Sequence, residues 1–180
     1  NTPVETAENR YPVRITEYRL GTDTGGAGKF RGGLNVVKGY MNLSETTMLG
    51  IQFDRTITPS WGLFDGEDGS IPRVFILPGR VEGRTLSKVH QLPLHHADTF
   101  EAHTGGGGGY GPPWEREVWR VREDITDGYV SLEEARSRYG VVFVVDNSQT
   151  VDIRATNQAR KRLASLVPAA DKVSRKQTTI

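Results

Sequence analysis

Glycine is concentrated in three short stretches of this chain, and this distribution limits the folds that the chain can adopt. The stretches are residues 23–33, 64–69 and 105–111, and the last of them reads GGGGGYG. Glycine makes up 21 of the 180 residues, well above its usual share of roughly 7%. Clustered glycine marks places where the backbone turns with positive φ or approaches another backbone closely. We therefore expect turns or close backbone contacts at these stretches.

Short segments of alternating apolar and polar residues separate the glycine clusters. They are residues 13–20, 34–41, 48–53, 72–77 and 98–104. A period near two, with β-branched and aromatic residues, is typical of half-buried antiparallel strands. The first two thirds of the chain is therefore predicted to be mostly β.

The pattern becomes helical after the two prolines at positions 112 and 113. One apolar stripe, at spacings of four, three and four residues, is formed by Trp114, Val118, Val121 and Ile125. This spacing predicts an amphipathic helix over residues 114–125. Further along, Ser131 followed by Glu134 is a capping-box pattern, which predicts a short helix that extends through Arg138.

The remaining residues show the signals of a hairpin and a final helix. The apolar run 141–145 and the alternating segment 150–154 predict two paired strands with a turn between them. Thr156 is the expected N-cap of a helix over residues 157–166.

These elements together predict an α+β fold: a predominantly antiparallel β domain with Gly-rich turns and a C-terminal helix–hairpin–helix region. We expect residues 1–113 to form a mainly β platform and residues 114–167 the α/β C-terminal part of the same domain. Residues 168–180 are polar and are expected to form a flexible tail.

The charge balance and the absence of cysteine exclude several classes of function. Lys and Arg number 23 against 22 Asp and Glu, a net charge of +1, so the basic face that a nucleic-acid partner requires is not predicted. No apolar run reaches the roughly 20 residues of a membrane-spanning helix. A chain with no cysteine has no disulfide, thiolate metal site or cysteine nucleophile, which fits a cytoplasmic protein.

The glycine run matches two nucleotide-binding patterns only by letter. Residues 106–111 fit G-x-G-x-x-G, but the preceding strand alternates and the two following prolines remove donors where a helix should begin. Residues 26–30 resemble the end of a P-loop, yet Asp23 and Phe30 stand where that loop needs glycine and Ser or Thr. A structural or substrate-flanking turn is the preferred interpretation of the run.

Metal-binding and catalytic patterns are weak throughout the chain. The histidines are His90, His95, His96 and His103. His96 and Asp98 share a strand face, but two ligands are too few for a tetrahedral site. The sequence contains no nucleophile elbow and no H-E-x-x-H. We therefore predict no metal ligand and no catalytic residue.

Three cations lie beside turns or strand ends, where each could clamp a carboxylate or phosphate: Arg31, Arg55 and Lys88. A surface ion pair is the alternative for each of them. The predicted substrate or interface loop combines these cations with residues of the glycine clusters. Its members are Arg31, Gly32, Gly33, Arg55, Lys88, Gly107, Gly108, Gly109 and Tyr110.

Taken in order, four segments resemble the carboxy-terminal region of the hydantoinase B and oxoprolinase family. They are residues 1–5 (NTPVE) with Tyr11 and Pro12, residues 23–34 (DTGGAGKFRGGL), residues 105–111, and residues 127–131 (DGYVS) with Ala135, Arg136 and residues 139–142 (YGVV). The resemblance extends to Arg55, Pro59, residues 61–63 and residues 86–88. Asp65 and the pair Ala97-Asp98 depart from the glycines usual in the family.

The resemblance implies a subunit of an ATP-dependent enzyme that opens cyclic amides such as hydantoins, oxoproline or lactams. In that family an A-type subunit carries the ATP site and phosphorylates the substrate's oxygen, and the B part completes the reaction on the activated substrate. The metal-binding and catalytic motifs of the B part lie upstream of the matching region. The expected partners are therefore the upstream part of a B-type subunit, an ATP-binding A-type subunit, and a small cyclic amide or ketone.

The resemblance also implies that this chain alone binds no cofactor and is inactive. ATP with magnesium, and with or without a further divalent metal, belongs to the full complex. The chain does not begin with methionine, which leads us to expect the downstream piece of a longer subunit. Two alternatives remain open: a related ketone carboxylase, acting on acetone or acetophenone, and a non-catalytic assembly module.

Overall fold

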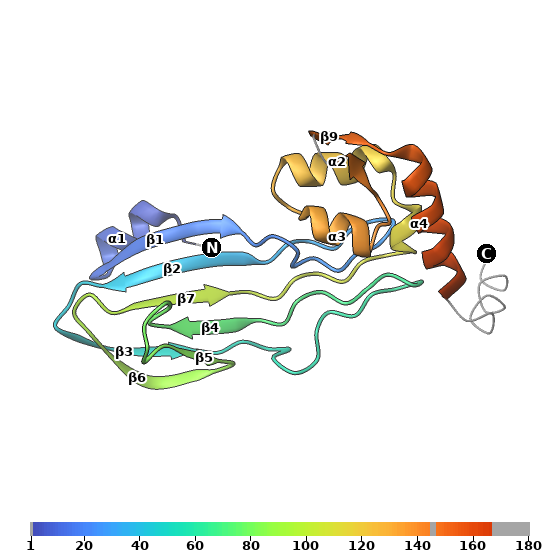
Figure 1. Ribbon diagram of the computed structural model, residues 1–180. Helices are drawn as coiled ribbons and strands as arrows, with labels where there is room; N and C mark the ends of the chain where they lie inside the picture. Colours follow the sequence, from blue (N-terminus) through green and yellow to red (C-terminus); the bar gives the residue numbers. More distant parts are fainter. Residues whose placement is uncertain (1, 145–146, 167–180) are drawn as a thin grey trace.

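The computed structural model describes residues 2–144 and 147–166. The fold is mixed α+β with antiparallel sheets and, within this described part, four α-helices. Figure 1 shows most of the strands at one end of the molecule and, at the other, the C-terminal helices with the short strands Phe143–Val144 and Asn147–Val151, the two ends being joined by extended segments that run side by side. The predicted tail, residues 168–180, lies outside the described residues.

The main sheet has five strands in the order β1-β2-β7-β4-β5, and all neighbours are antiparallel. Their bounds are Val13–Leu20, Val36–Asn42, Thr99–His103, Arg73–Ile76 and Arg84–Leu86. Tyr40 and Phe100 lie opposite each other on β2 and β7, with stacked rings whose centroids are 4.7 Å apart. Four of the five predicted strands form this sheet, because alternation reports a sheet with one buried face.

A second sheet is made of β3 (Thr46–Ile51) and β6 (Val89–His95). Side chains from both sheets form one hydrophobic cluster, whose buried members are Val74, Ile76, Val89, Leu94 and Phe100. β5 and β6 were not predicted. β6 contains Pro93, which is compatible with a strand only where no ladder N–H is needed.

The chain begins its described part with a short helix, α1 (Val4–Arg10), which the sequence did not predict. Seven residues are too few for a helix that is stable alone. Glu8 Oε1 accepts a hydrogen bond from Ile15 N at 2.7 Å, and Ala7 is buried. Contacts with β1 therefore fix this helix against the sheet, as Figure 1 shows.

The predicted helix over residues 114–125 is interrupted. A short 3-10 turn covers Pro113–Glu115, and α2 begins only at Val118 and ends at Thr126. Between them Arg116 has an extended backbone, with φ −63° and ψ 134°. The apolar stripe continues across the break, so periodicity alone could not reveal it.

α3 (Leu132–Ser137) begins as predicted, because Ser131 Oγ accepts a hydrogen bond from Glu134 N at 3.1 Å. After it, β8 (Phe143–Val144) and β9 (Asn147–Val151) pair antiparallel, and α4 spans Ile153–Leu166. Part of the predicted turn between these strands lies outside the described residues.

The predicted cap of the last helix is wrong. Thr156 lies inside α4, where it is buried and its Oγ1 accepts from Val142 N at 3.0 Å. Asp152 caps instead, because its Oδ1 accepts from Ala155 N at 3.0 Å. The earlier start also shortens the predicted strand 150–154, since its last two residues belong to the helix.

A second hydrophobic cluster lies among the helices. Its buried members are Ala27, Val121, Val130, Ala135, Tyr139 and Val141. Ala27 is the contribution of the first glycine cluster to this core. Among the described residues, none of the helices has the length and apolar character needed to cross a bilayer.

Candidate functional site

The three glycine clusters come together between the two hydrophobic clusters. We call residues 24–33 the first glycine segment, residues 60–70 the second and residues 105–111 the central run. The central run bonds to both neighbours through its backbone, and we call the three segments together the glycine layer. Gly107 N donates to Gly33 O and Gly26 N to Gly107 O (both 2.8 Å), while Gly109 N donates to Glu67 O (2.8 Å) and Leu63 N to Gly109 O (2.9 Å).

The glycines permit this packing because they have no side chain. An added Cβ would lie 2.1 Å from Trp61 O at Gly108 and 2.1 Å from Ala27 O at Gly109. A Cβ on Gly32 would lie 2.0 Å from a carbonyl oxygen of the central run. These distances are far shorter than real Cβ contacts, so the three segments could not approach with larger residues.

The central run is extended between its neighbours, and the turn preferred from the sequence is not what the structure shows there. Of residues 105–111, Gly111 alone has a φ in the left-handed region, at 72°. Close approach, not positive φ, accounts for most of the run. The requirement differs by position: at Gly33 a Cβ would meet nothing within 4 Å, and at Gly107 the nearest atom would be 3.0 Å away.

The backbone of the central run does not fit a phosphate. A phosphate cradle needs free backbone N–H groups. In the central run, the N–H groups of residues 106, 107, 109, 110 and 111 all donate to carbonyl oxygens of the same layer. Within the described residues, no three His, Cys, Asp or Glu side chains come close enough to hold a metal ion.

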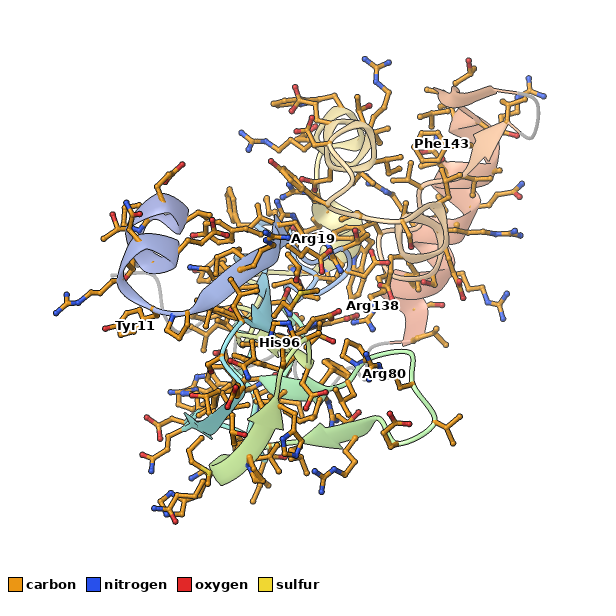
Figure 2. All side chains as sticks on the ribbon, turned by 90° about the vertical axis from the view of Figure 1, so that its left-hand side faces the viewer. Tyr11, Arg19, Arg80, His96, Arg138 and Phe143 are labelled. Atoms are coloured by element: carbon orange, nitrogen blue, oxygen red, sulfur yellow. The ribbon has the colours of Figure 1, made fainter. Side chains whose placement is uncertain are left out.

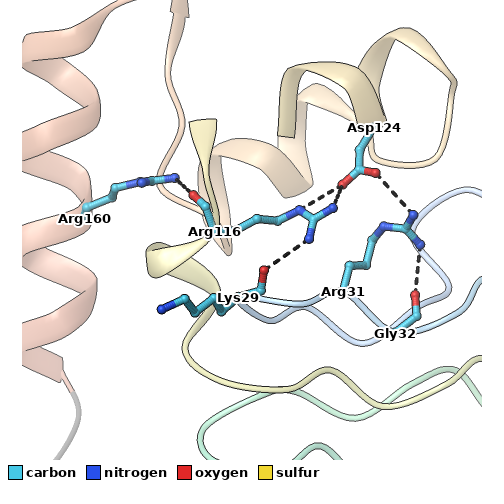
Figure 3. A network of polar contacts seen from close by, with 6 residues as sticks. All are labelled: Lys29, Arg31, Gly32, Arg116, Asp124 and Arg160. Atoms are coloured by element: carbon cyan, nitrogen blue, oxygen red, sulfur yellow. Dashed lines mark hydrogen bonds and ion pairs between the residues drawn. The ribbon is translucent and has the colours of Figure 1, made fainter. Parts of the chain in front are cut away.

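Arg31 leads from the first glycine segment into an ion-pair network with the helical part (Figure 3). Its Nη2 lies 3.2 Å from Asp124 Oδ1 on α2, and its Nη1 donates to Gly32 O at 2.9 Å. Its guanidinium lies over the Tyr129 ring, 5.4 Å from the centroid. Arg31 is therefore held by the protein itself and does not extend into solvent as a free cation.

Asp124 also binds a second arginine. Arg116 Nη2 and Nε lie 2.8 and 3.1 Å from Asp124 Oδ2, and its Nη1 donates to Lys29 O at 3.2 Å. Both side chains are only 8% exposed. The break before α2 explains this contact, because the extended backbone of Arg116 places its side chain between the helix and the first glycine segment (Figure 3).

A third arginine ties α4 to the same place. Arg160 Nη2 donates to Arg116 O at 2.7 Å, and its Nε donates to Tyr139 O at 3.2 Å. Burial lowers the pKa of Arg160, against the raising effect of Glu117. Burial also raises the pKa of Tyr139 to about 12. The network therefore joins α2 and α4, with Arg116 between them, to the first glycine segment.

The second glycine segment has its own contact with the helices. Arg138, labelled in Figure 2, follows α3 and pairs with both Glu67 and Glu134. Burial raises the pKa of Glu134 above its usual value, while Arg138 acts in the opposite direction. Two glycine segments are thus fixed to the helical part by arginine–carboxylate pairs.

Tyr110 marks an exposed group of apolar side chains at the edge of the glycine layer. We call Phe30, Leu63, Phe64 and Tyr110 the aromatic patch. The Tyr110 ring centroid lies 5.0 Å from that of Phe64 and 6.2 Å from that of Phe30. All four residues are between 48% and 58% exposed. Aromatic side chains gathered on a surface are typical of a protein interface.

The other predicted cations are not part of one site with Arg31. Arg55 is exposed, has φ 57°, and lies over the Trp61 ring at 4.8 Å. It borders a small pocket of about 190 Å³ beside Gly105. Lys88 lies in the exposed connection between β5 and β6, which belongs to the sheet region. The structure therefore gathers the predicted glycines, Arg31 and Tyr110, while Arg55 borders the layer and Lys88 does not.

Sequence reasoning missed the partners of these residues. Asp124 and Arg116 are charged positions near an amphipathic helix, where charge usually marks the solvated face. Phe30 and Phe64 carried a usable signal, since each is an isolated aromatic residue within or beside a glycine cluster. Because the neighbouring glycines have no side chains to pack against, an aromatic side chain at such a position is expected to be exposed.

Comparison with known proteins places this architecture in a family. The hydantoinase B/oxoprolinase family matches residues 1–113. An uncharacterized protein of Methanocaldococcus jannaschii is 39% identical over 163 residues, which cover 89% of this chain and 28% of that protein. The B subunit of a putative D-/L-hydantoinase from a Pseudomonas species is 32% identical over 164 residues, covering 89% of this chain and 27% of that protein.

Two solved structures share the fold. The ATP-dependent caprolactamase of Pseudomonas jessenii has a TM-score of 0.71 and 27% identity, covering 89% of this chain and 28% of that one. Acetone carboxylase in its nucleotide-free structure has a TM-score of 0.71 and 22% identity, covering 97% of this chain and 28% of that one. This chain belongs to the hydantoinase B/oxoprolinase family, and it spans about 28% of the length of these relatives.

Proposed function

We propose that this chain is part of the B-type subunit of an ATP-dependent enzyme that opens cyclic amides, working with an ATP-binding A-type subunit. The observation that carries the proposal is its family membership, together with its similarity to the B subunit of a putative hydantoinase and to an ATP-dependent caprolactamase. A cytoplasmic location, where ATP is available, goes with this proposal.

In this proposal the chain supplies shape and contacts, not the reacting groups. Residues 1–113 act as the platform and residues 114–167 as the C-terminal part of the same domain, including the α3, β8–β9 and α4 region. Five backbone N–H groups of the central run donate to carbonyl oxygens of the same layer. In this proposal ATP, magnesium and any further metal are held by other parts of the complex.

The Gly-rich segments and the aromatic patch are the proposed contact with the rest of the assembly. Phe30, Phe64 and Tyr110 expose about half of their surface on a backbone that close packing holds rigid. Rigid aromatic anchors lose little conformational entropy on binding. This arrangement supports a docking role for residues 107–110 more than direct contact with a substrate.

A ketone carboxylase subunit is the second candidate, since acetone carboxylase has the same fold over 97% of this chain. The similarity to acetone carboxylase concerns the fold alone, so the ketone carboxylase ranks behind the cyclic-amide hydrolase as a candidate. A purely structural assembly module is the third candidate, and it is consistent with the absence of a nucleophile–base pair from our predicted sites.

The test is reconstitution of the full-length protein with an A-type subunit. Ring opening of hydantoin, 5-oxoproline and caprolactam would be followed by product chromatography together with ADP release. Parallel reactions would contain acetone and labelled bicarbonate. We expect ATP-dependent ring opening of a cyclic amide. Label fixation on the ketone would favour the second candidate, and no turnover with either substrate class would leave the assembly role.

A patch variant tests the docking role separately. Phe64→Ser and Tyr110→Ser in the full-length protein should weaken its association with the A-type subunit, measured by sedimentation velocity. Thermal unfolding of these variants should be nearly unchanged. Val81→Ser, at a fully exposed position in the turn after β4, is the matched control and should have no effect on either measurement. Equal association of patch variant, control and wild type would contradict the docking role.

A further inference from the structure

A groove distinct from the glycine layer lies on one face of the main sheet. Its volume is about 620 Å³, and it is bordered by α1, by the start of β1 and by β3. The floor is the face of the main sheet that carries Lys38, Tyr40 and Phe100. Tyr11, at the end of α1 in Figure 2, lies at its border. The volume is within the range of small-molecule pockets, which are mostly apolar with a few polar groups.

Lys38 is the charged group of this groove. Only 8% of the residue is exposed. Its Nζ lies 3.4 Å from Thr2 O, and 5.0 and 5.6 Å from the ring centroids of Tyr18 and Tyr40. Among the described residues, no carboxylate lies within 4.0 Å of this ammonium group. Its charge is therefore balanced by ring faces and one long hydrogen bond.

In this environment the ammonium group of Lys38 can still donate further hydrogen bonds and pair with an anion. A buried ammonium group without a carboxylate is unfavourable, and aromatic faces offset only part of the lost hydration. An ammonium group has three donors, and one long bond to Thr2 O uses one of them. By contrast, the amide of the neighbouring Asn42 is fully engaged, since its Nδ2 donates to three backbone carbonyls.

We propose that this groove binds a small amphipathic monoanion, a carboxylate with a short apolar or aromatic body. The carboxylate would pair with Lys38 Nζ, and the body would lie against Tyr40, Phe100 and Leu49.

A single carboxylate fits this groove better than a phosphate does. Among the described residues that line the groove, Lys38 is the one cation. The neighbouring backbone amides are committed, because β2 is paired with β1 on one edge and with β7 on the other. A phosphate carries up to two charges and is bound by several donors, whereas a carboxylate needs one cationic partner.

The test compares two ligands of equal size on the intact protein. Hexanoate and hexanamide differ in charge but hardly in shape. Isothermal titration calorimetry should show that hexanoate binds about 10- to 100-fold more tightly, the range of a hydrogen bond to a charged group. Equal binding of the two ligands, or no binding of hexanoate, would overturn the proposal. The second outcome would mean that another part of the protein covers the groove.

Variants assign the effect to Lys38. Lys38→Met keeps the apolar stem and should remove the preference for hexanoate over hexanamide. Lys38→Arg keeps the charge and should retain that preference. Lys88→Met removes an exposed lysine elsewhere and should change nothing. A Lys38→Met protein that folds normally and still prefers hexanoate would also refute the site. The readout involves no ATP and no turnover, so its result is independent of the proposed enzymatic function.

Discussion

Replacing Gly109 by alanine tests whether the glycine layer depends on backbone contact. The added Cβ would lie 2.1 Å from Ala27 O and 2.7 Å from Gly26 O. Both obstacles are backbone atoms, so no side chain can rotate away. Because favourable carbon contacts begin near roughly 3.5 Å, the first glycine segment would have to move away from the central run.

The expected loss of stability has two parts. Forcing extra atoms into a packed interior costs about 1–3 kcal/mol. Separation of the first glycine segment from the central run also weakens two backbone bonds, Gly26 N to Gly107 O and Gly107 N to Gly33 O, each worth about 1 kcal/mol. The sum is about 3–5 kcal/mol, which lowers the melting temperature of a chain of this size by on the order of 10 °C.

Two other glycines of the layer are matched controls. At Gly33 an added Cβ meets nothing within 4 Å, and its φ lies outside the left-handed region. Gly33→Ala should therefore stabilise by about 0.4–1 kcal/mol, because alanine restricts the unfolded chain. Gly107→Ala should be intermediate, since its nearest contact, Gly33 N, would be at 3.0 Å.

Thermal unfolding followed by circular dichroism gives the ranking of the three variants. The reasoning requires the order Gly33→Ala, Gly107→Ala, Gly109→Ala from most to least stable. A Gly109→Ala protein that melts within about 2 °C of the wild type would show that the segments are not packed as described. Equal destabilisation by all three variants would indicate that flexibility, not close approach, is what glycine provides.

Three further substitutions test the contacts around the layer. Asp124→Ala removes the shared partner of the buried Arg116 and the partly buried Arg31 and should lower the free energy of unfolding in urea by about 3–5 kcal/mol, whereas Glu115→Gln, in an exposed pair with a lysine, should change it by less than about 1 kcal/mol. Because the folded-state pKa of Tyr139 is raised to about 12 from 10.0, its contribution is fully present below pH 10 and is lost as pH rises through 12. On going from below pH 10 to above pH 12, the wild type should therefore lose about 2–3 kcal/mol more of its free energy of unfolding than Tyr139→Phe does. Urea titrations of variant and wild type in both pH ranges measure this difference. Ser131→Ala deletes the N-cap of α3 and should cost about 1 kcal/mol in the same assay; an unchanged midpoint would contradict the cap.

The sheet could be predicted where local pattern and tertiary environment agree. β1 has the predicted bounds, Val13–Leu20, because alternation along one strand reports which side faces the core. β6 could not be recognised in this way, since Pro93 interrupts its pattern and its pairing with β3 is a long-range property. The same reason applies to α1, a helix of seven residues that contact with β1 holds in place.

The site was less predictable than the fold. The glycines and Arg31 were recognised as notable, but their role depends on partners far away in sequence. The bond between Arg31 and Asp124 spans 93 residues, and nothing in the local pattern of either residue indicates the other. The break at Arg116 goes together with another long-range contact, the bond from Arg116 Nη1 to Lys29 O across 87 residues, and the helical periodicity that continues through the break does not indicate it.

The geometry of the layer has a consequence for how the two ends of the molecule are coupled. The sheet end and the helical end have separate hydrophobic clusters, and Ala27 is the single buried apolar residue that the described glycine segments contribute to either. The connection between the ends therefore depends on backbone hydrogen bonds and on the pairs made by Asp124 and Arg138. Backbone contacts of this kind tolerate little displacement, because a carbonyl and an N–H lose their bond within about 1 Å. A partner that docks on the aromatic patch would thus act on a rigid surface, and any shift that it imposed on the central run would reach both neighbouring segments.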